Sequence, residues 1–264
     1  MSTAAAVFDE KLARWKQEMN FPWARLKYKL TQANLARHLG TNHPLRILDA
    51  GGGNGLDSLP FAAQGHFVEI VDYSQEMLAD ALVQAREAKA QKNVHVHQSD
   101  LRYLPQIFPE AQFDLVLCHN VLQYLEDIPT LLRNLVKVLK PGGLISIISV
   151  NRYSNPYQSA FFGDNLVEAL VQLETRTATA KIFEASVTSY CAAEISAGLE
   201  EQGLIIENDY GLRCLCDYWG DNQRKLDPAI FEQLEKLEFT LTDRHPYKLL
   251  ARYFQVIARK TENG

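Results

Sequence analysis

Four glycines lie within five residues near the start of this chain, and they predict a loop that holds a ligand. They belong to the run Leu45-Arg46-Ile47-Leu48-Asp49-Ala50-Gly51-Gly52-Gly53-Asn54-Gly55, in which an apolar strand ends on an acid. A turn from a strand into a helix must reach positive φ, and its backbone must come within contact distance of the ligand. A Cβ atom would obstruct both, so the run indicates a nucleotide-type ligand site.

The spacing of the glycines narrows the class of ligand. A dinucleotide loop carries G-x-G-x-x-G and directs a helix N-terminus at a pyrophosphate. Here the spacing is G-x-G-x-G from Gly51 to Gly55. The carboxylate of Asp49 would repel a pyrophosphate, but it suits a ligand that carries an ammonium or sulfonium group. These features favour S-adenosylmethionine over NAD as the cofactor.

Polar residues also follow the later predicted strands. The strand at 66–71 leads to Asp72, about 20 residues after the first glycine, where an acid that binds ribose is expected. The strand at 94–97 leads to Asp100, and the strand at 113–118 leads to His119. Ligands of open α/β sheets bind at this edge, so the three side chains are expected around one site. Asp100 also fits a helix cap, and His119 also fits a hydrogen bond to backbone at a strand end.

The periodicity of apolar residues predicts how these positions are arranged along the chain. Helix is expected from about 8 to 39, with an apolar stripe that includes Trp15 and Leu30 and a break near Pro22. Strands and helices alternate from 44 to 150, which indicates parallel strands joined by crossovers. Residues 151–157 are expected to form a loop. Further helices are expected at 166–173, 192–202 and 228–237, and strands at 204–209 and 250–258.

We therefore predict a single domain over residues 1–264 with four parts. These are an N-terminal helical extension (1–43), a cofactor-binding core (44–150), a lid (151–190) and a C-terminal helix with two strands (191–264). The 264 residues are 47% hydrophobic, which is typical of a globular protein with one large core. No signal peptide or membrane span is apparent, so a cytoplasmic location is expected. The four cysteines include no C-x-x-C pair, and neither disulfides nor a metal site are expected.

Five motifs in order resemble those of the class I S-adenosylmethionine-dependent methyltransferases: D-A-G-G-G-N-G, V-D-Y-S, S-D-L, F-D-L-V-L and L-K-P-G-G. The resemblance covers residues 44 to 150. It implies an α/β, Rossmann-like fold with a mainly parallel seven-stranded sheet, helices on both faces, an N-terminal helical extension and a lid insert. The cofactor site that it implies, together with the glycine loop, consists of Asp49, Gly51, Gly52, Gly53, Asp72, Tyr73, Asp100, Leu101 and His119.

A narrower resemblance extends beyond this core. Gly211-Leu212-Arg213, Asp217-Tyr218, Pro246-Tyr247 and the closing run Ala251 to Lys260 are similar to the bacterial tRNA 5-carboxymethoxyuridine methyltransferases. Such enzymes methylate the carboxylate of a modified wobble uridine, so the resemblance implies a tRNA anticodon loop as partner. It further implies that Arg25 contacts the carboxylate of the cofactor. The implied substrate contacts are Arg213, as the catalytic group that orients the acceptor, with Tyr218, Tyr247 and Arg252.

The charge pattern keeps other functions open. The net charge is −5, and residues 151–200 hold three basic residues against six acids, whereas tight tRNA binding draws on several Lys or Arg side chains. The main alternative is therefore a methyltransferase that acts on the carboxylate or hydroxyl of a small molecule. A protein that binds the cofactor without turnover is a further possibility, and an NAD-linked enzyme is disfavoured by the loop spacing.

Overall fold

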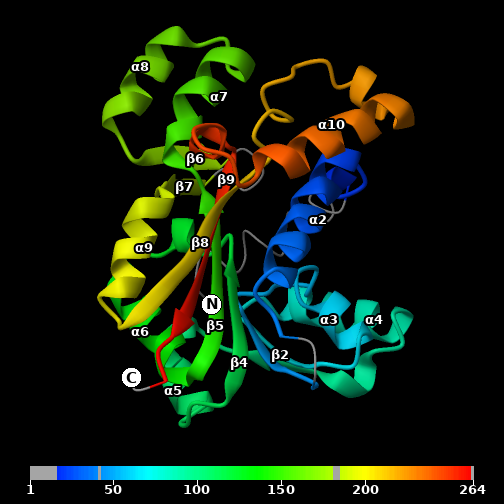
Figure 1. Cartoon of the computed structure of the whole chain (residues 1–264), viewed down its shortest axis with the longest axis vertical. Coiled ribbons are helices and arrows are strands. Elements are labelled where there is room, and N and C mark those ends of the chain that lie inside the picture. The colour runs from blue at the N-terminus through cyan, green and yellow to red at the C-terminus, as the bar shows by residue number, and fades with distance from the viewer. Residues whose placement is uncertain (1–16, 41–42, 181–184, 263–264) are drawn as a thin grey trace.

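The protein is built around one seven-stranded sheet. The computed structural model describes residues 17–40, 43–180 and 185–262. The strands are β1 (Arg46–Ala50), β2 (Phe67–Asp72), β3 (Val94–Gln98), β4 (Phe113–His119), β5 (Leu139–Val150), β8 (Leu204–Leu212) and β9 (Tyr253–Lys260). Their order is β3-β2-β1-β4-β5-β9-β8, and β9 pairs antiparallel with both of its neighbours (Figure 1). The predicted sheet of seven mainly parallel strands is confirmed.

Helices cover both faces of this sheet. The α-helices are α2 (Pro22–Ala36), α3 (Leu59–Ala63), α4 (Gln75–Glu87), α5 (Leu104–Ile107), α6 (Ile128–Val138), α7 (Asn155–Phe162), α8 (Leu166–Glu174), α9 (Ala192–Glu200) and α10 (Pro228–Leu241). The 3₁₀ turns are η1 (Gln91–Asn93), η2 (Leu101–Tyr103), η3 (Leu122–Tyr124), η4 (Arg152–Ser154), η5 (Arg224–Leu226) and η6 (Tyr247–Leu250). One apolar cluster joins α5, α6 and α9 to one face of the sheet, and another joins the end of α2, α3 and α4 to the opposite face.

The central strands are apolar on both sides because both of their faces are covered. All but one of the residues of β4 are buried, as are the last four residues of β1. Buried parallel strands are expected to show such continuous apolar runs rather than alternation. The sheet thus provides a rigid floor, and the loops at its carboxyl edge are free to carry the chemistry.

The strand order places a crevice beside β1. The chain proceeds from β1 to β2 and β3 on one side, and then returns to place β4 and β5 on the other side. Connections that leave two neighbouring strands in opposite directions open a crevice at the carboxyl ends of those strands, where ligands of such sheets bind. The glycine loop follows β1 and His119 ends β4, so the residues predicted to do chemistry lie at this position.

Helix α2 lies next to this crevice. It begins with Pro22 in its first turn, where the missing N–H of proline costs no hydrogen bond, and this start matches the predicted break. Leu26 and Leu30 pack with Phe231 of α10 and with the end of β8. Trp15, the first residue of the predicted apolar stripe, lies outside the described residues.

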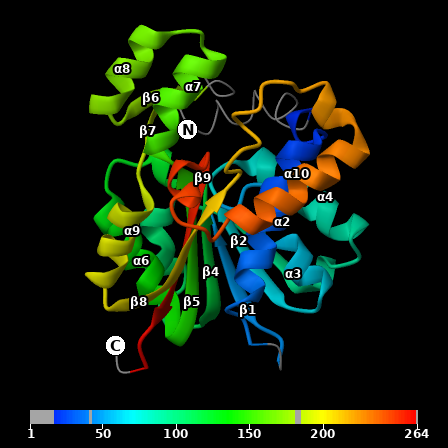
Figure 2. The same ribbon diagram turned by 45° about the horizontal axis from the view of Figure 1, so that its top comes forward.

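The 151–190 segment differs from the prediction at its start. Residues 151–157 were expected to be a loop, but they form η4 and the first turn of α7. The Asn151 side chain accepts a hydrogen bond from the Tyr153 N–H, and Pro156 occupies the first turn of α7, so residues typical of loops here begin helices. The segment also contains an unexpected hairpin of β6 (Thr177–Ala180) and β7 (Ala185–Thr188). Figure 2 shows α7 and α8 beyond the carboxyl edge of the sheet.

The C-terminal elements differ by a few residues from those predicted. The last strand begins at Tyr253 instead of residue 250, because η6 occupies the preceding residues. Helix α10 continues to Leu241, four residues beyond the predicted end. In the described part of the chain, none of the helices combines the length and apolar character needed to cross a lipid bilayer.

Candidate active site

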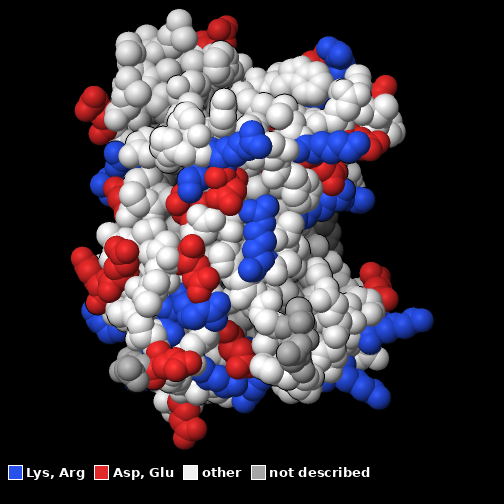
Figure 3. Space-filling view, in the orientation of Figure 1, with Lys and Arg blue, Asp and Glu red and all other residues white. Residues whose placement is uncertain are grey.

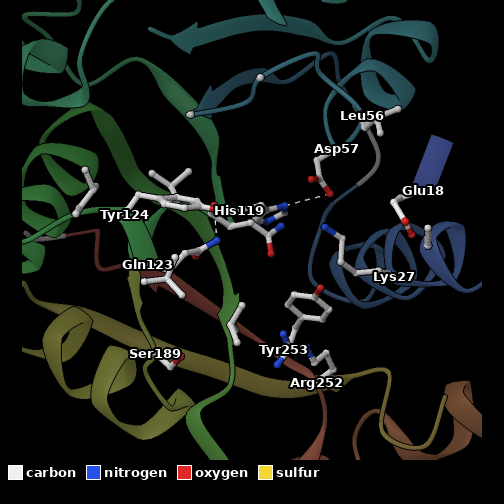
Figure 4. Close-up of a pocket in the computed structure, with 18 of the residues that line it drawn as sticks. Glu18, Lys27, Leu56, Asp57, His119, Gln123, Tyr124, Ser189, Arg252 and Tyr253 are labelled. Carbon is white, nitrogen blue, oxygen red and sulfur yellow. Dashed lines mark hydrogen bonds and ion pairs between the residues drawn. The ribbon is translucent and has the colours of Figure 1, made fainter. Parts of the chain in front are cut away.

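A cavity of about 1010 Å³ opens at the carboxyl edge of the sheet. Its wall is formed by the glycine loop after β1, the ends of β2, β3 and β4, helix α2, the 151–190 segment, and the residues that follow β8 and begin β9. Figure 4 shows side chains from these separate parts of the chain converging on one space. The volume is large enough for a nucleoside-type cofactor together with part of an acceptor.

The glycine loop fits closely against the residues beneath it. A Cβ atom on Gly52 would lie 2.3 Å from the carboxyl carbon of Asp49, and one on Gly51, where φ is +72°, would lie 2.4 Å from a methyl carbon of Val121. The Gly53 N–H donates a 2.9 Å hydrogen bond to the Asp72 carboxylate. Glycine is therefore required here so that the backbone itself forms the cavity wall.

Asp49 lies under this loop rather than on the cavity surface. Its side chain is buried, and its Oδ2 atom has no hydrogen-bond partner among the described residues. Burial raises the pKa of Asp49 to about 7, and the neighbouring carboxylates Asp57 and Asp72 add to this increase. A positive charge in the cavity would favour the ionised form, so the site fits a cationic cofactor.

Asp72 is the last residue of β2, and Asp100 immediately precedes η2. Both line the cavity, together with Tyr73 and Leu101. Asp72 accepts hydrogen bonds from the N–H groups of Gly53 and Ser74, which fixes its carboxylate at the rim. Asp100 caps η2 and pairs with Arg102 at 2.9 Å. The predicted helix-cap role of Asp100 is thus present, and the residue also faces the cavity.

His119 connects the cavity to the interior of the sheet. Its Nδ1 atom lies 3.2 Å from the Asp57 carboxylate (Figure 4). Its Nε2 atom lies 2.9 Å from the Ser146 hydroxyl. Burial alone would raise the pKa of Asp57, but His119 and Lys27 outweigh it and hold that pKa below its usual range. The side chain of His119 is therefore fixed by two buried partners.

A second group of charged residues surrounds Tyr253, at the end of the cavity formed by α2 and the start of β9. Lys27 Nζ and the guanidinium carbons of Arg213 and Arg252 each lie 5.6 Å from the centre of its ring. We call Lys27, Arg213 and Arg252 the cationic cluster. Burial alone would raise the pKa of the Tyr253 hydroxyl, but Arg213, Arg252 and Lys27 lower it overall. This end of the cavity therefore suits an anion.

Arg213 is held in place by two acids: Asp217, which belongs to a motif of the narrower resemblance, and Glu238, which the sequence did not single out. Its guanidinium pairs with Asp217, which also lines the cavity. The carboxylate of Glu238 on α10 is fully buried and accepts hydrogen bonds from three successive backbone N–H groups, those of Cys214, Leu215 and Cys216, at 2.6 to 2.8 Å. Glu238 thus fixes the loop between Arg213 and Asp217.

Most of the predicted site residues meet in this one cavity. Those that line it are Gly51, Gly52, Gly53, Asp72, Tyr73, Asp100, Leu101, His119, Arg213 and Arg252. Four others lie elsewhere. Asp49 is beneath the loop, and Arg25 is exposed, since α2 turns Ala24, Lys27 and Tyr28 toward the cavity instead.

The two predicted aromatic contacts are also placed outside the cavity wall. The Tyr218 hydroxyl donates to the Leu250 carbonyl, and its ring packs edge-on against Tyr157, so its polar atom is already used within the protein. Tyr247 lies on η6 and is 54% exposed. The expected substrate contacts of Tyr218 and Tyr247 would therefore have to come from parts of a ligand that extend beyond the cavity.

Three residues that contribute to the site were not among those predicted to contact the cofactor or the acceptor: Lys27, Asp57 and Tyr253. Asp57 follows the glycine loop by two residues, which is a usable signal. Lys27 and Tyr253 lie 226 positions apart in the sequence, and only the packing of α2 beside β9 brings them together. Lys27 has no neighbouring motif, and Tyr253 lies within the closing run Ala251 to Lys260, which does not distinguish it from the other residues of that run.

Comparison with known proteins identifies the class. A family of methyltransferase domains matches residues 47–143. An S-adenosylmethionine-dependent methyltransferase from Mesorhizobium loti has the same fold, with a TM-score of 0.56, 22% identity, and coverage of 88% of this chain and 98% of that one. Geranyl diphosphate C-methyltransferase from Streptomyces coelicolor, solved with S-adenosyl-L-homocysteine, shows a TM-score of 0.57 at 20% identity over 88% of this chain and 79% of its own.

The chain belongs to the class I S-adenosylmethionine-dependent methyltransferases, and S-adenosylmethionine is its cofactor. Within that class it is similar to tRNA 5-carboxymethoxyuridine methyltransferase from Escherichia coli K12, with 30% identity over 246 residues and 90% coverage of both chains. Ubiquinone biosynthesis O-methyltransferase from Rickettsia akari is 34% identical over 140 residues, which is 50% of this chain and 51% of that protein. The predicted cofactor and reaction class are confirmed.

Proposed function

We propose that this methyltransferase transfers a methyl group to the side-chain carboxylate of 5-carboxymethoxyuridine at the wobble position of tRNA. The observation that carries this proposal is the cationic cluster around Tyr253, in the same cavity as the glycine loop. A carboxylate is the acceptor that such a cluster would hold best. The similarity to a relative that is named for this substrate supports the same choice.

The chemistry asks little of the protein beyond alignment. S-adenosylmethionine, when bound, supplies a methyl group that is already activated on its sulfonium. A carboxylate is ionised at neutral pH and needs no general base. Arg213, fixed by Asp217 and by the Glu238-bound loop, is placed to orient one carboxylate oxygen. Lys27 and Arg252 add positive charge on the other sides of Tyr253.

The same charges favour release of the product. Methylation converts the anionic carboxylate into a neutral ester, so the electrostatic attraction to the cationic cluster is lost when the reaction is complete. The acceptor is therefore held more tightly before transfer than after it. We also propose that the 151–190 segment acts as a lid, since its residues complete one wall of the cavity.

The direct test uses bulk tRNA from cells that lack this gene, incubated with the purified protein and labelled S-adenosylmethionine. Mass spectrometry of the digested nucleosides should show the methyl ester of 5-carboxymethoxyuridine. An unlabelled tRNA pool, with cofactor binding confirmed by calorimetry, would refute the tRNA substrate.

A small-molecule carboxylate is the second candidate acceptor. It is favoured by one observation: among the described residues that line the cavity from the 151–190 segment, none is a lysine or arginine. A phosphate backbone would ordinarily be met by such side chains. Turnover of a small acid with no activity on tRNA would establish this alternative.

A further inference from the structure

The 151–190 segment lines the cavity mainly with side chains that form hydrogen bonds. Its lining residues include Asn155, Gln158, Ser159, Asn165, Gln172 and Ser189. A wall of amides and hydroxyls that also includes the Glu168 carboxylate, and that has no basic residue among its described members, is unsuited to a phosphate. It suits a neutral ligand edge that presents its own donors and acceptors.

Two glutamines in this wall each have one buried amide atom without a hydrogen-bond partner among the described residues. These atoms are Nε2 of Gln158 on α7 and Oε1 of Gln172 on α8. Gln172 is only 7% exposed. Buried polar atoms are nearly always paired, so an unpaired donor and an unpaired acceptor that share a cavity wall indicate a ligand with the complementary groups.

The orientation of the Gln172 amide is fixed by its neighbours. Its Nε2 atom donates to the Glu168 carboxylate at 2.6 Å and to the Thr177 carbonyl at 3.1 Å. Both partners are acceptors, so an inverted amide would place oxygen against oxygen. Glu168 is held in turn at the start of α8, where its N–H donates to the Asn165 side chain. The amide atom of Gln172 that is left without a partner is therefore an acceptor.

We propose that Gln158 and Gln172 recognise the imide edge of a uracil base. The Gln172 oxygen accepts a hydrogen bond from N3–H, and the Gln158 amide donates to an adjacent ring carbonyl. Cytosine has an acceptor at N3 and an exocyclic amine donor, so its edge opposes an amide that cannot invert. This inference rests on the proposed function, in which the 5-substituent of the same base lies at the cationic cluster.

The proposal divides recognition between two parts of one cavity wall. The cationic cluster meets the charged substituent, and the 151–190 segment meets the uncharged base. The lining residues of the 151–190 segment then need no basic side chains, because a base edge carries no charge to neutralise. Single-stranded anticodon bases can enter such a pocket, since their hydrogen-bonding edges are not paired.

The test is a cycle that combines protein variants with a modified substrate. An anticodon stem-loop RNA carries 5-carboxymethoxyuridine, either with N3–H or with an N3-methyl group that removes the donor. Gln172→Met and Gln158→Met remove the amides, and Gln202→Met is a matched control, since Gln202 does not line the cavity. We expect Gln172→Met and N3-methylation each to lower kcat/KM about 10- to 100-fold, with little further loss when they are combined.

Two results would overturn the proposal. One is equal methylation of the N3–H and N3-methyl RNAs by the wild-type protein. The other is a Gln172→Met variant that still prefers the N3–H RNA over the N3-methyl RNA as strongly as the wild-type protein does. Melting temperatures show whether the variants fold, and the Gln158→Met variant tests the second contact independently.

Turnover of the N3–H RNA by the wild-type protein separates this inference from the proposed function. If the protein fails to methylate that RNA, the proposed function fails. Calorimetric binding of free 5-carboxymethoxyuridine and of its N3-methyl derivative, with S-adenosylhomocysteine present, then shows whether the protein recognises the N3–H edge of the base. Equal affinities, or no binding of either, would exclude it.

Discussion

Replacing Asp49 by asparagine should change how cofactor affinity depends on pH. Burial raises the pKa of Asp49 to about 7, so its carboxyl group is mostly protonated at pH 6 and mostly ionised at pH 8. A cation in the cavity interacts favourably only with the ionised form. With a pKa of about 7, the ionised fraction rises about tenfold over these two pH units. The affinity of the wild-type protein for S-adenosylmethionine should rise by up to about tenfold relative to that of Asp49→Asn.

The assay is isothermal titration calorimetry of both proteins at pH 6, 7 and 8. The quantity to compare is the ratio of the wild-type affinity to the Asp49→Asn affinity at each pH, because titration of the cofactor's own amino group affects both proteins equally. S-adenosylhomocysteine, which lacks the sulfonium, shows which positive charge Asp49 senses. A ratio that stays constant from pH 6 to pH 8 would refute the electrostatic role of Asp49.

The raised pKa of Asp49 also predicts how the stability of the protein depends on pH. Because the folded-state pKa of Asp49 lies above its ordinary value of 3.8, the folded protein binds more protons than the unfolded chain between about pH 4 and pH 7. This contribution to stability is therefore lost as the pH rises through that window. In the absence of cofactor, Asp49→Asn should be more stable than the wild type at pH 8, by up to about 4 kcal/mol, and the difference should vanish near pH 4. Equal urea denaturation curves at pH 8 would contradict the assigned burial effect.

Four further substitutions test other parts of the site. Gly52→Ala places a Cβ atom 2.3 Å from the buried carboxyl group beneath the loop, so it should weaken cofactor binding at least about tenfold by calorimetry, whereas Gly220→Ala, which has open space, should not. Lys27→Met should raise KM for the acceptor about tenfold or more and leave cofactor affinity nearly unchanged. Arg25→Met should be nearly neutral in the same assays, and lost cofactor affinity there would restore the sequence-based role of Arg25. Glu238→Ala removes the acceptor of three backbone N–H groups, two of which are buried, so urea denaturation should show a loss of about 2–4 kcal/mol in the free energy of unfolding. An unchanged midpoint would exclude this role.

The cofactor half of the site was largely predictable from the sequence because its residues lie next to the motifs that position them. The glycine loop follows β1 directly, and Asp72 and His119 end β2 and β4, the strands on either side of β1. In a parallel sheet the ends of successive strands meet at one edge, so local sequence order becomes spatial proximity. Each of these residues could be located by counting from a strand end.

The acceptor half was harder to predict because it depends on contacts between distant parts of the chain. The cofactor contact on α2 was assigned to Arg25, whereas Lys27 of the same helix faces the cavity, because the direction in which α2 turns its faces is set by its packing against α10 and β8. Charge type alone did not distinguish the cation that enters the cavity from the one that faces solvent. The 151–157 error has a different origin, since Asn, Ser and Pro favour both loops and helix starts.

The position of β9 has a consequence for the order in which the enzyme can assemble. This strand follows the other strands of the sheet in sequence, yet it occupies an interior place between β5 and β8. During synthesis the cofactor half can begin to form while the sheet still lacks that strand. Tyr253, the first residue of β9, is absent until then, so a nascent chain would acquire a place for the methyl donor before it has one for the acceptor. The many charged side chains over the surface in Figure 3, of both signs, would help to keep such an incomplete sheet in solution.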